Sequence, residues 1–340
     1  MNPYKKILYV LFIALFLGCA YNTKTDKHQF RRNNIVNVHD KVKEIEINED
    51  DALIGPVVRL YLLQNYLIIA NPKTINKLIY LFDKNSFKYV TAIGNRGQGP
   101  GEIANIGYIA SNEADRKFYV SDLGKQVIFS YGLDSVLSNP LYLPQVKMRM
   151  NKGFFPDRYQ YINDTLSYCR IIEPIENVDF RDAIGIFNMN TGEIKEIGNK
   201  HSNLKKNRIG VAVSMENGIY VEYSHNYDLL TICSLNGDLK SCIYGPDWSS
   251  QLDRKNHFGK VVFIKNKMLA SYSGGNYYTD EYFTTKFFVF DITGNYLQTI
   301  DVGYKITDYC YDKENNRIIM NLNDADMQFA YLDLDGIIEK

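Results

Sequence analysis

The chain has 340 residues, 45% of them hydrophobic, and its 39 basic and 39 acidic residues give a formal net charge of zero. There is enough apolar surface for a substantial core, which excludes wholesale disorder, and the clustered basic excess typical of nucleic-acid-binding proteins is missing. No nucleic-acid partner is therefore expected. The 27 tyrosines and 18 phenylalanines, together with valine and isoleucine, favour β structure.

The chain begins with a targeting segment. A lysine pair precedes the eleven-residue apolar stretch Ile7 to Leu17, which is too short for a membrane helix of ~20 residues and fits a signal-peptide core. The stretch ends in Phe16-Leu17-Gly18-Cys19, which resembles a bacterial lipobox with phenylalanine where leucine is preferred. We predict that residues 1–18 are a lipoprotein signal peptide and that Cys19 carries the lipid. An ordinary secreted protein is the alternative.

A polar segment follows the attachment site. Residues 19–34 show no hydrophobic period and are predicted to tether a membrane lipid to a single domain, residues 35–340. Ala20 does not resemble an inner-membrane retention signal, which favours the outer membrane of the cell envelope. Only Asp26 lies nearby, so the acid-rich tag of many surface lipoproteins is missing, which favours the periplasmic face.

One pattern recurs through the rest of the chain: an apolar strand, a turn built on Asp or Asn with Gly, and a second strand. Glycine or a polar substitute supplies the positive φ that a tight hairpin needs. The spacing of roughly 40 to 57 residues is typical of propeller blades. The six copies are Ile79–Ser86, Val127–Ser135, Ile184–Gly192, Leu230–Gly237, Phe287–Gly294 and Phe329–Gly336.

A second hairpin precedes each copy, as in Val57–Ala70 and Lys260–Tyr272. Two hairpins per unit predict four-stranded antiparallel blades, and hence an all-β, six-bladed β-propeller. The last unit ends four residues after Gly336, so it lacks an outer strand. The alternating segment within Ile35–Asn48 is predicted to supply that strand and to close the ring, with an open sandwich as the alternative.

The most specific sequence motif lies in residues 93–134. It comprises the Gly-rich run Ile93–Ile103 and the strand Phe118–Phe129, which contains Tyr-Val-Ser-Asp. This motif resembles an NHL-type propeller repeat. Behind a lipoprotein signal, it is similar to the six-bladed propeller lipoproteins of Bacteroidota, some of which are called TolB-like. The resemblance implies the propeller fold, and it implies no catalytic residues.

Several chemistries are not supported by the sequence. The glycines of Gly94–Gly101 lie between strands and contain Pro100, whereas a phosphate-binding loop opens a helix. The five histidines form no metal-binding spacing, and Asn323–Asp326 is read as a solvated acidic turn rather than a calcium site. The four cysteines after Cys19 are expected to be buried free thiols. No cofactor or metal is expected.

Two loops between the hairpins are unusually long, Glu173–Ala183 and Ser273–Thr285, and the single tryptophan, Trp248, lies in a loop between blades. Propeller topology places these loops on one rim, where exposed aromatics beside carboxylates and amides suit sugars or peptides. Packing of the loops themselves is the alternative. The candidate ligand-binding residues are Arg96, Gln98, Glu102, His225, Asp228, Trp248, Tyr277, Tyr278, Asp280 and Tyr282.

These features predict a lipid-anchored envelope propeller that acts as a non-catalytic binding or scaffold protein for a glycan, a peptide or a partner protein. No catalytic residue is assigned. The alternative is an envelope enzyme, an NHL-like lyase or a glycan-acting hydrolase, using carboxylates with His225 or His257 near the channel mouth.

Overall fold

The structure is a computed structural model. It describes residues 25–338 except for residues 49, 51, 140, 152–154, 176–178, 199–203, 205–207 and 253. Cys19 and the signal peptide lie outside the described residues, so lipidation stays a prediction. Within the described part, no helix has the length and apolar character needed to cross a bilayer.

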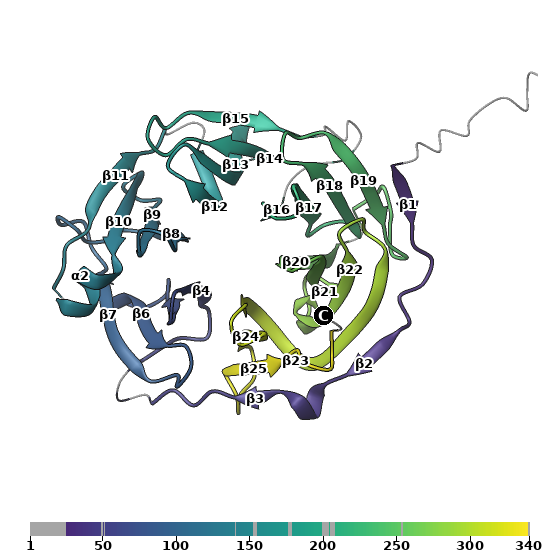
Figure 1. The fold of residues 1–340 in the computed structure, drawn as a ribbon, viewed down its shortest axis with the longest axis horizontal. Helices are drawn as coiled ribbons and strands as arrows, with labels where there is room; N and C mark the ends of the chain where they lie inside the picture. Colours follow the sequence, from purple (N-terminus) through teal and green to yellow (C-terminus); the bar gives the residue numbers. More distant parts are fainter. Residues whose placement is uncertain are drawn as a thin grey trace, which may run out of the picture.

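Antiparallel sheets surround a common centre, as Figure 1 shows. Blade one consists of β4 (Arg59–Leu63), β5 (Tyr66–Ala70), β6 (Lys77–Asp83) and β7 (Tyr89–Asn95). Blade two consists of β8 (Ile106–Asn112), β9 (Lys117–Asp122), β10 (Val127–Gly132) and β11 (Gln145–Arg149), with the short helix α2 (Leu133–Ser138) between its last two strands. Blade three consists of β12 (Phe155–Asn163), β13 (Leu166–Ile175), β14 (Asp179–Phe187) and β15 (Ile194–Ile197).

The second half of the ring follows the same order from the inner to the outer strand. Blade four consists of β16 (Ile209–Ser214), β17 (Ile219–Ser224), β18 (Leu229–Ser234) and β19 (Leu239–Tyr244). Blade five consists of β20 (Lys255–Ile264), β21 (Lys267–Asn276), β22 (Thr284–Asp291) and the first half of β23 (Tyr296–Asp312). Blade six consists of the second half of β23, β24 (Arg317–Leu322), β25 (Phe329–Asp333) and β3 (Lys43–Glu44).

Blades five and six share one seventeen-residue strand, β23, so their sheets join into a single eight-stranded sheet. The strand changes blade at Gly303, whose φ of +78° lies in the left-handed region that favours glycine. A Cβ at this position would lie 2.8 Å from Nδ1 of His39. Glycine therefore allows the chain to pass from one blade to the next without a loop.

The succession of hairpins predicted from the sequence is confirmed, but the prediction of one long loop is wrong. Residues Glu173–Ala183 do not form a long loop, because β13 and β14 continue as a ladder that pairs Glu173 with Arg181 and Pro174 with Phe180. The other long loop is shortened in the same way: β21 extends to Asn276, and the turn holds the 3-10 helix η2 (Asp280–Tyr282).

The N-terminal segment, residues 25–45, runs along the outside of blades four, five and six, and we call it the belt (Figure 1, purple). Strand β1 (Asp26–His28) pairs in parallel with β19, and β2 (Ile35–Asn37) pairs in parallel with β23. The 3-10 helix η1 (His39–Lys41) and β3 follow. The first part of the belt, residues 25–34, lies within the predicted tether, and the structure places it against blades four and five.

The physical reason is that the belt pairs mainly through its backbone. The amide of Cys242 donates to the carbonyl of Thr25 at 2.9 Å, and the amide of Thr299 donates to the carbonyl of Asn34 at 2.7 Å. Added edge strands of this kind need no hydrophobic period, since backbone groups provide the pairing.

Strand β3 is the fourth strand of blade six. Glu44 lies opposite Ala330 and Lys43 opposite Tyr331, and the amide of Ile45 donates to the carbonyl of Phe329 at 2.8 Å. The side chain of Ile45 is buried against the core between blades six and one. The paired part is shorter than the alternating segment that ends at Asn48.

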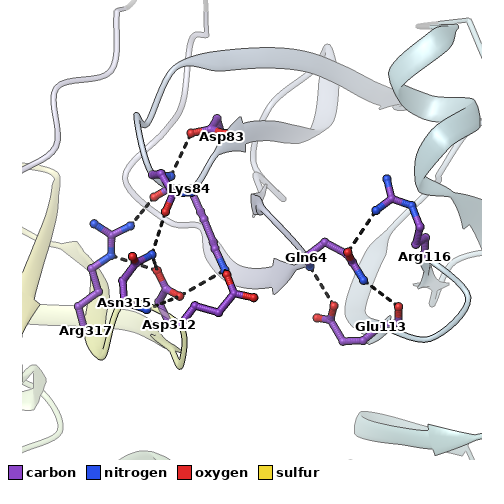
Figure 2. A network of polar contacts seen from close by, with 10 residues as sticks. Gln64, Asp83, Lys84, Glu113, Arg116, Asp312, Asn315 and Arg317 are labelled. Atoms are coloured by element: carbon purple, nitrogen blue, oxygen red, sulfur yellow. Dashed lines mark hydrogen bonds and ion pairs between the residues drawn. The ribbon is translucent and has the colours of Figure 1, made fainter.

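Buried charges join blade six to blade one at the end of the ring opposite the blade-to-blade loops (Figure 2). The side chains of Lys84 and Asp312 are 4% and 1% exposed, with Nζ 3.4 Å from Oδ1. Arg317 donates from Nε to Asp312 at 3.1 Å and from Nη2 to the carbonyl of Lys84. Figure 2 also shows the neighbouring seam between blades one and two, where Gln64 binds Glu113 and Arg116.

Cysteines in the described part of the chain are all buried and free, as expected for core residues. They are Cys169, Cys233, Cys242 and Cys310.

Candidate functional site

The innermost strands of all six blades line a central cavity of about 850 Å³. Strands β4, β8, β12, β16 and β20 and the second half of β23 each contribute side chains to its wall. Tyrosines are prominent among them, namely Tyr61, Tyr108, Tyr159, Tyr161, Tyr223, Tyr282, Tyr309 and Tyr311. Pockets that hold small molecules typically measure ~300–1,000 Å³ and are lined by apolar and aromatic groups, so the cavity has the size and the character of a ligand site.

The inner strands are irregular where polar side chains meet the cavity. The register shifts at Arg158 in β12, around Gly259 and Lys260 in β20, and at Thr307 in β23. Arg158 also has a φ of +46°, in the left-handed region that non-glycine residues seldom occupy. A bulge places an extra residue in one strand and turns its side chain out of the regular alternation, and such bulges are common beside active sites.

Arg158 lines the cavity, and its positive charge has no close carboxylate partner among the described residues. Its side chain is 36% exposed, and its nearest carboxylate oxygen, Oδ2 of Asp157, lies 4.0 Å from Nε. That oxygen already accepts a hydrogen bond from Nη2 of Arg170, and Nη1 of the same arginine lies 3.6 Å from Oδ2 of the fully buried Asp182. Among the described residues, Arg158 therefore has no carboxylate within hydrogen-bond distance.

Lys260 is the second cation at the cavity and has a partner. Its Nζ lies 2.9 Å from Oδ1 of Asp308 and donates to the carbonyl of Tyr309 at 2.5 Å. The other carboxylate oxygen of Asp308 accepts from the amide of Leu60 at 2.7 Å. Burial opposes the charge of Lys260, but Asp308 and Tyr108 outweigh burial and raise the pKa of the lysine above its ordinary value.

His225 lies in the turn between β17 and β18 and lines the same cavity. Burial, followed by the positive charges of Arg158 and Arg170, lowers the pKa of its imidazole to about 3. The ring is therefore neutral near pH 7. It lies edge-to-face with Tyr223, at a centroid separation of 5.7 Å.

An aromatic cluster on the rim of blade five continues into the cavity. Tyr277, Tyr278 and Tyr282 are 37%, 76% and 38% exposed, and Tyr277 lies edge-to-face with both of the others. Tyr282 and Phe283 also line the cavity. We call Tyr277, Tyr278, Tyr282 and Phe283 the rim cluster.

Neighbouring polar groups hold the rim cluster in place. Asn256 donates from Nδ2 to the carbonyl of Tyr282 at 2.8 Å, and the guanidinium carbon of Arg208 lies 4.5 Å from the ring centre of Tyr277. Asp280, a predicted ligand-binding residue, pairs with Lys305 at 2.8 Å, and its side chain is 82% exposed. Three predicted aromatic residues and His225 are thus brought together with basic groups at one side of the ring.

The glycine-rich loop is held together by its own residues. Glu102 accepts from the amide of Gly99 at 2.8 Å, and a Cβ on Gly97 would lie 1.9 Å from the Glu102 carboxylate, so this glycine makes room for the acid. Arg96 donates to the carbonyls of Thr74 and Pro72. Gln98 is exposed on the same loop. Arg96, Gln98 and Glu102 do not line the cavity, so they are not brought together with His225 and the rim cluster.

Two further predicted residues belong to packing on blade four. Asp228 is fully buried and bound to Arg32 of the belt. Trp248 packs edge-to-face on Tyr244, with 4.7 Å between the ring centres, and also contacts Tyr227. These rings form a cluster with Leu229 beside the outer strand β19. Neither Asp228 nor Trp248 lines the cavity.

Arg158, Lys260, Asp308 and Asn256 are not among the residues predicted from the sequence. A signal was present, since Arg158 and Lys260 begin the first hairpin of their units, and the first strand of a blade forms the channel wall. The bulges that direct these side chains inward have no signature in the sequence. No cluster of three or more metal-binding side chains is found among the described residues, and Oδ1 of Asp324 accepts two backbone amides of its own exposed turn.

Fold and site define a six-bladed β-propeller with a ligand-sized cavity at its centre. The chain belongs to the family DUF5128, described as a 6-bladed beta-propeller, whose model matches residues 32–207, just over half of the chain. The resemblance to NHL-type and TolB-like propellers stays a prediction. No curated protein matches the sequence.

Solved structures share the fold at low identity. A DUF4221 family member from Bacteroides vulgatus is 13% identical, with a TM-score of 0.61, covering 88% of this chain and 98% of that chain. A protein named as exported, from Bacteroides fragilis, is 10% identical, with a TM-score of 0.56 and coverages of 91% and 98%. A luciferin-regenerating enzyme is 9% identical, with a TM-score of 0.56 and coverages of 85% and 94%. At this level of identity the likeness concerns the fold alone.

Proposed function

We propose that this propeller is a non-catalytic binding protein whose ligand enters the central cavity past the rim cluster. The observation that carries the proposal is continuity: Tyr282 and Phe283 belong both to the exposed aromatic cluster and to the wall of the 850 Å³ cavity. Exposed tyrosine rings offer large contact areas and lose little conformational entropy on binding. A glycan, a peptide or a segment of a partner protein suits this surface.

The test has two stages. The full-length protein is first extracted in mild detergent, and compounds that co-purify are identified alongside a screen of glycan and peptide arrays. Tyr278→Ala and Tyr282→Ala should then each weaken binding by more than about 1 kcal/mol, the usual scale of a hot spot, without lowering the melting temperature. Trp248→Ala is the matched control, because this ring packs outside the cavity: its melting temperature should fall while binding persists.

Two outcomes would contradict the proposal. Unchanged binding in both tyrosine variants would return the rim cluster to a packing role. Steady conversion of a bound compound into product would make the protein an enzyme, the alternative considered from the sequence.

A location in the cell envelope, anchored through lipid at Cys19, is part of the same proposal. It is supported by the lipobox-like sequence and agrees with the export named for the Bacteroides fragilis neighbour. Because the belt holds Thr25 against blade four, only residues 19–24 remain as tether, and six residues span at most about 20 Å. Cys19→Ser should release the protein from membranes or leave an uncleaved precursor, whereas a soluble wild-type protein would contradict the anchor.

We also propose that the N-terminal strand closes the ring. The pairing of β3 with β25 supports closure, because it gives blade six its fourth strand from the other end of the chain. The buried contacts of Lys84 and Arg317 with Asp312 support it as well, since they join the last blade to the first.

A further inference from the structure

We propose that the central cavity binds the oxyanion of an acidic ligand, a carboxylate or a phosphate, with Arg158 as the principal contact. This inference rests on the proposed function, because it names the chemical class of the ligand that the cavity accepts. It is carried by the charge of the wall and by the environment of a single arginine.

The charge balance of the cavity differs from that of the whole chain. The chain is formally neutral, but the described side chains that line the cavity include three cations, Arg59, Arg158 and Lys260, against one carboxylate, Asp308. The wall therefore carries an excess of two positive charges. A cavity with one sign of charge and low-dielectric walls concentrates the opposite ion.

The three cations are not equivalent. Lys260 is paired with Asp308, and Nη1 of Arg59 donates to the carbonyl of Gly107 at 2.7 Å. Arg158 has only the 4.0 Å approach to Asp157, whose oxygen is already bound to Arg170. A guanidinium presents a planar set of donors that matches a carboxylate or a phosphate, so Arg158 is the group with donors to spare.

The backbone holds Arg158 in place for this role. Its left-handed φ and its position in a bulge of β12 are costly features that the surrounding sheet imposes. Arg158 lies close enough to His225 and Tyr282 to influence their pKa values, so its charge is felt beside the rim cluster. The imidazole of His225 is neutral near pH 7, so the positive charge at this side of the wall comes from the arginine.

The experiment uses the full-length protein at fixed ionic strength with three probes: inorganic phosphate, D-glucuronate and D-glucose. Phosphate or glucuronate should raise the melting temperature of the wild-type protein, and glucose should not. Arg158→Gln should weaken the affinity for the anionic probe by about tenfold or more, which is the scale of a hydrogen bond to a charged group. Arg158→Lys should retain more of the affinity than the glutamine variant, because it keeps the charge.

Arg116→Gln is the matched control, because Arg116 is also an arginine with a left-handed φ, of +51°, but it lies in the turn between β8 and β9 and pairs with Asp134. This variant should bind the anionic probe like the wild type. If glucuronate binds more tightly than phosphate, the oxyanion that the cavity accepts is a carboxylate. If phosphate binds more tightly, it is a phosphate.

The inference is overturned if no anionic probe stabilises the wild-type protein, if glucose acts equally well, or if Arg158→Gln binds like the wild type. The proposed function is tested separately through the co-purified or array-identified ligand. If that ligand depends on Tyr282 and not on Arg158, the binding function stands and the anionic site fails. If it depends on neither residue, both fail.

Discussion

Two arginines of this molecule occupy opposite environments, and the contrast separates a packing contact from a candidate ligand contact. Arg32 comes from the belt and inserts between blades four and five, where its side chain is 5% exposed and its Nη1 lies 2.8 Å from Oδ1 of the fully buried Asp228. Its guanidinium carbon lies 4.6 Å from the ring centre of Phe288. Arg158 is 36% exposed to the cavity and has no comparable carboxylate partner.

The difference shows what a buried charge does in each place. Asp228 without Arg32 would be an uncompensated charge in an aromatic environment, so the pair holds the belt to the ring. Arg158 already tolerates the lack of a close partner, because the cavity leaves it accessible to solvent. We therefore expect changes in the belt to lower stability and changes at the cavity to alter ligand binding.

Removing part of the belt should produce the largest effect. Deletion of residues 35–48 removes β2 and β3, exposes the edge of β25 and loses the burial of Ile45, worth ~1.5–3 kcal/mol on its own. Against a typical net stability of ~5–15 kcal/mol, the variant should aggregate or melt far below the parent. Ile45→Ser should reproduce part of the loss, whereas Ile35→Ser, at a side chain that is 60% exposed, should not. A deletion variant that melts like the parent would place the closure elsewhere.

Breaking the buried ion pair should come second. Arg32→Ala leaves Asp228 buried without its partner and should lower the free energy of unfolding by about 3–5 kcal/mol, measured by denaturant titration. Arg158→Gln should change it by less than about 0.5 kcal/mol, as for an accessible side chain. Arg32→Met combined with Asp228→Asn should recover part of the loss. Equal stability losses at Arg32 and Arg158 would remove the distinction between the two regions.

Acid should have the smallest effect for each unit of pH. The folded pKa of His225, about 3, lies below the ordinary value of 6.5, so the unfolded chain binds more protons between these values. The contribution of His225 should therefore make the protein less stable as the pH falls from 6.5 toward 3, by at most ~1.4 kcal/mol per pH unit. In His225→Asn the melting temperature should fall less steeply over this range. His28→Asn, on the exposed face of β1, is the control, and a parallel fall in wild type and His225→Asn would contradict the prediction.

Local sequence determined the blades. Alternating strands with turns such as Asn236-Gly237, where Gly237 has a φ of +97°, identify hairpins because period and turn chemistry depend on neighbouring residues only. Counting these hairpins gave six blades, and the missing last strand pointed to the segment that contains β3. The grouping of Tyr277, Tyr278 and Tyr282 was also visible, since all three lie in one turn.

The tertiary structure decided the rest. The polar segment around Arg32 reads as a tether, because backbone pairing with β19 and β23 needs no hydrophobic pattern and the acceptor Asp228 lies 196 residues away. That distance in sequence hid the role of Asp228, and the packing of Trp248 on Tyr244 is seen only in the folded blade four. Arg158 became a cavity residue through a bulge, and the cation excess arises only when inner strands from six blades meet. Such properties depend on contacts between distant segments, whereas the blades themselves depend on local alternation and turns.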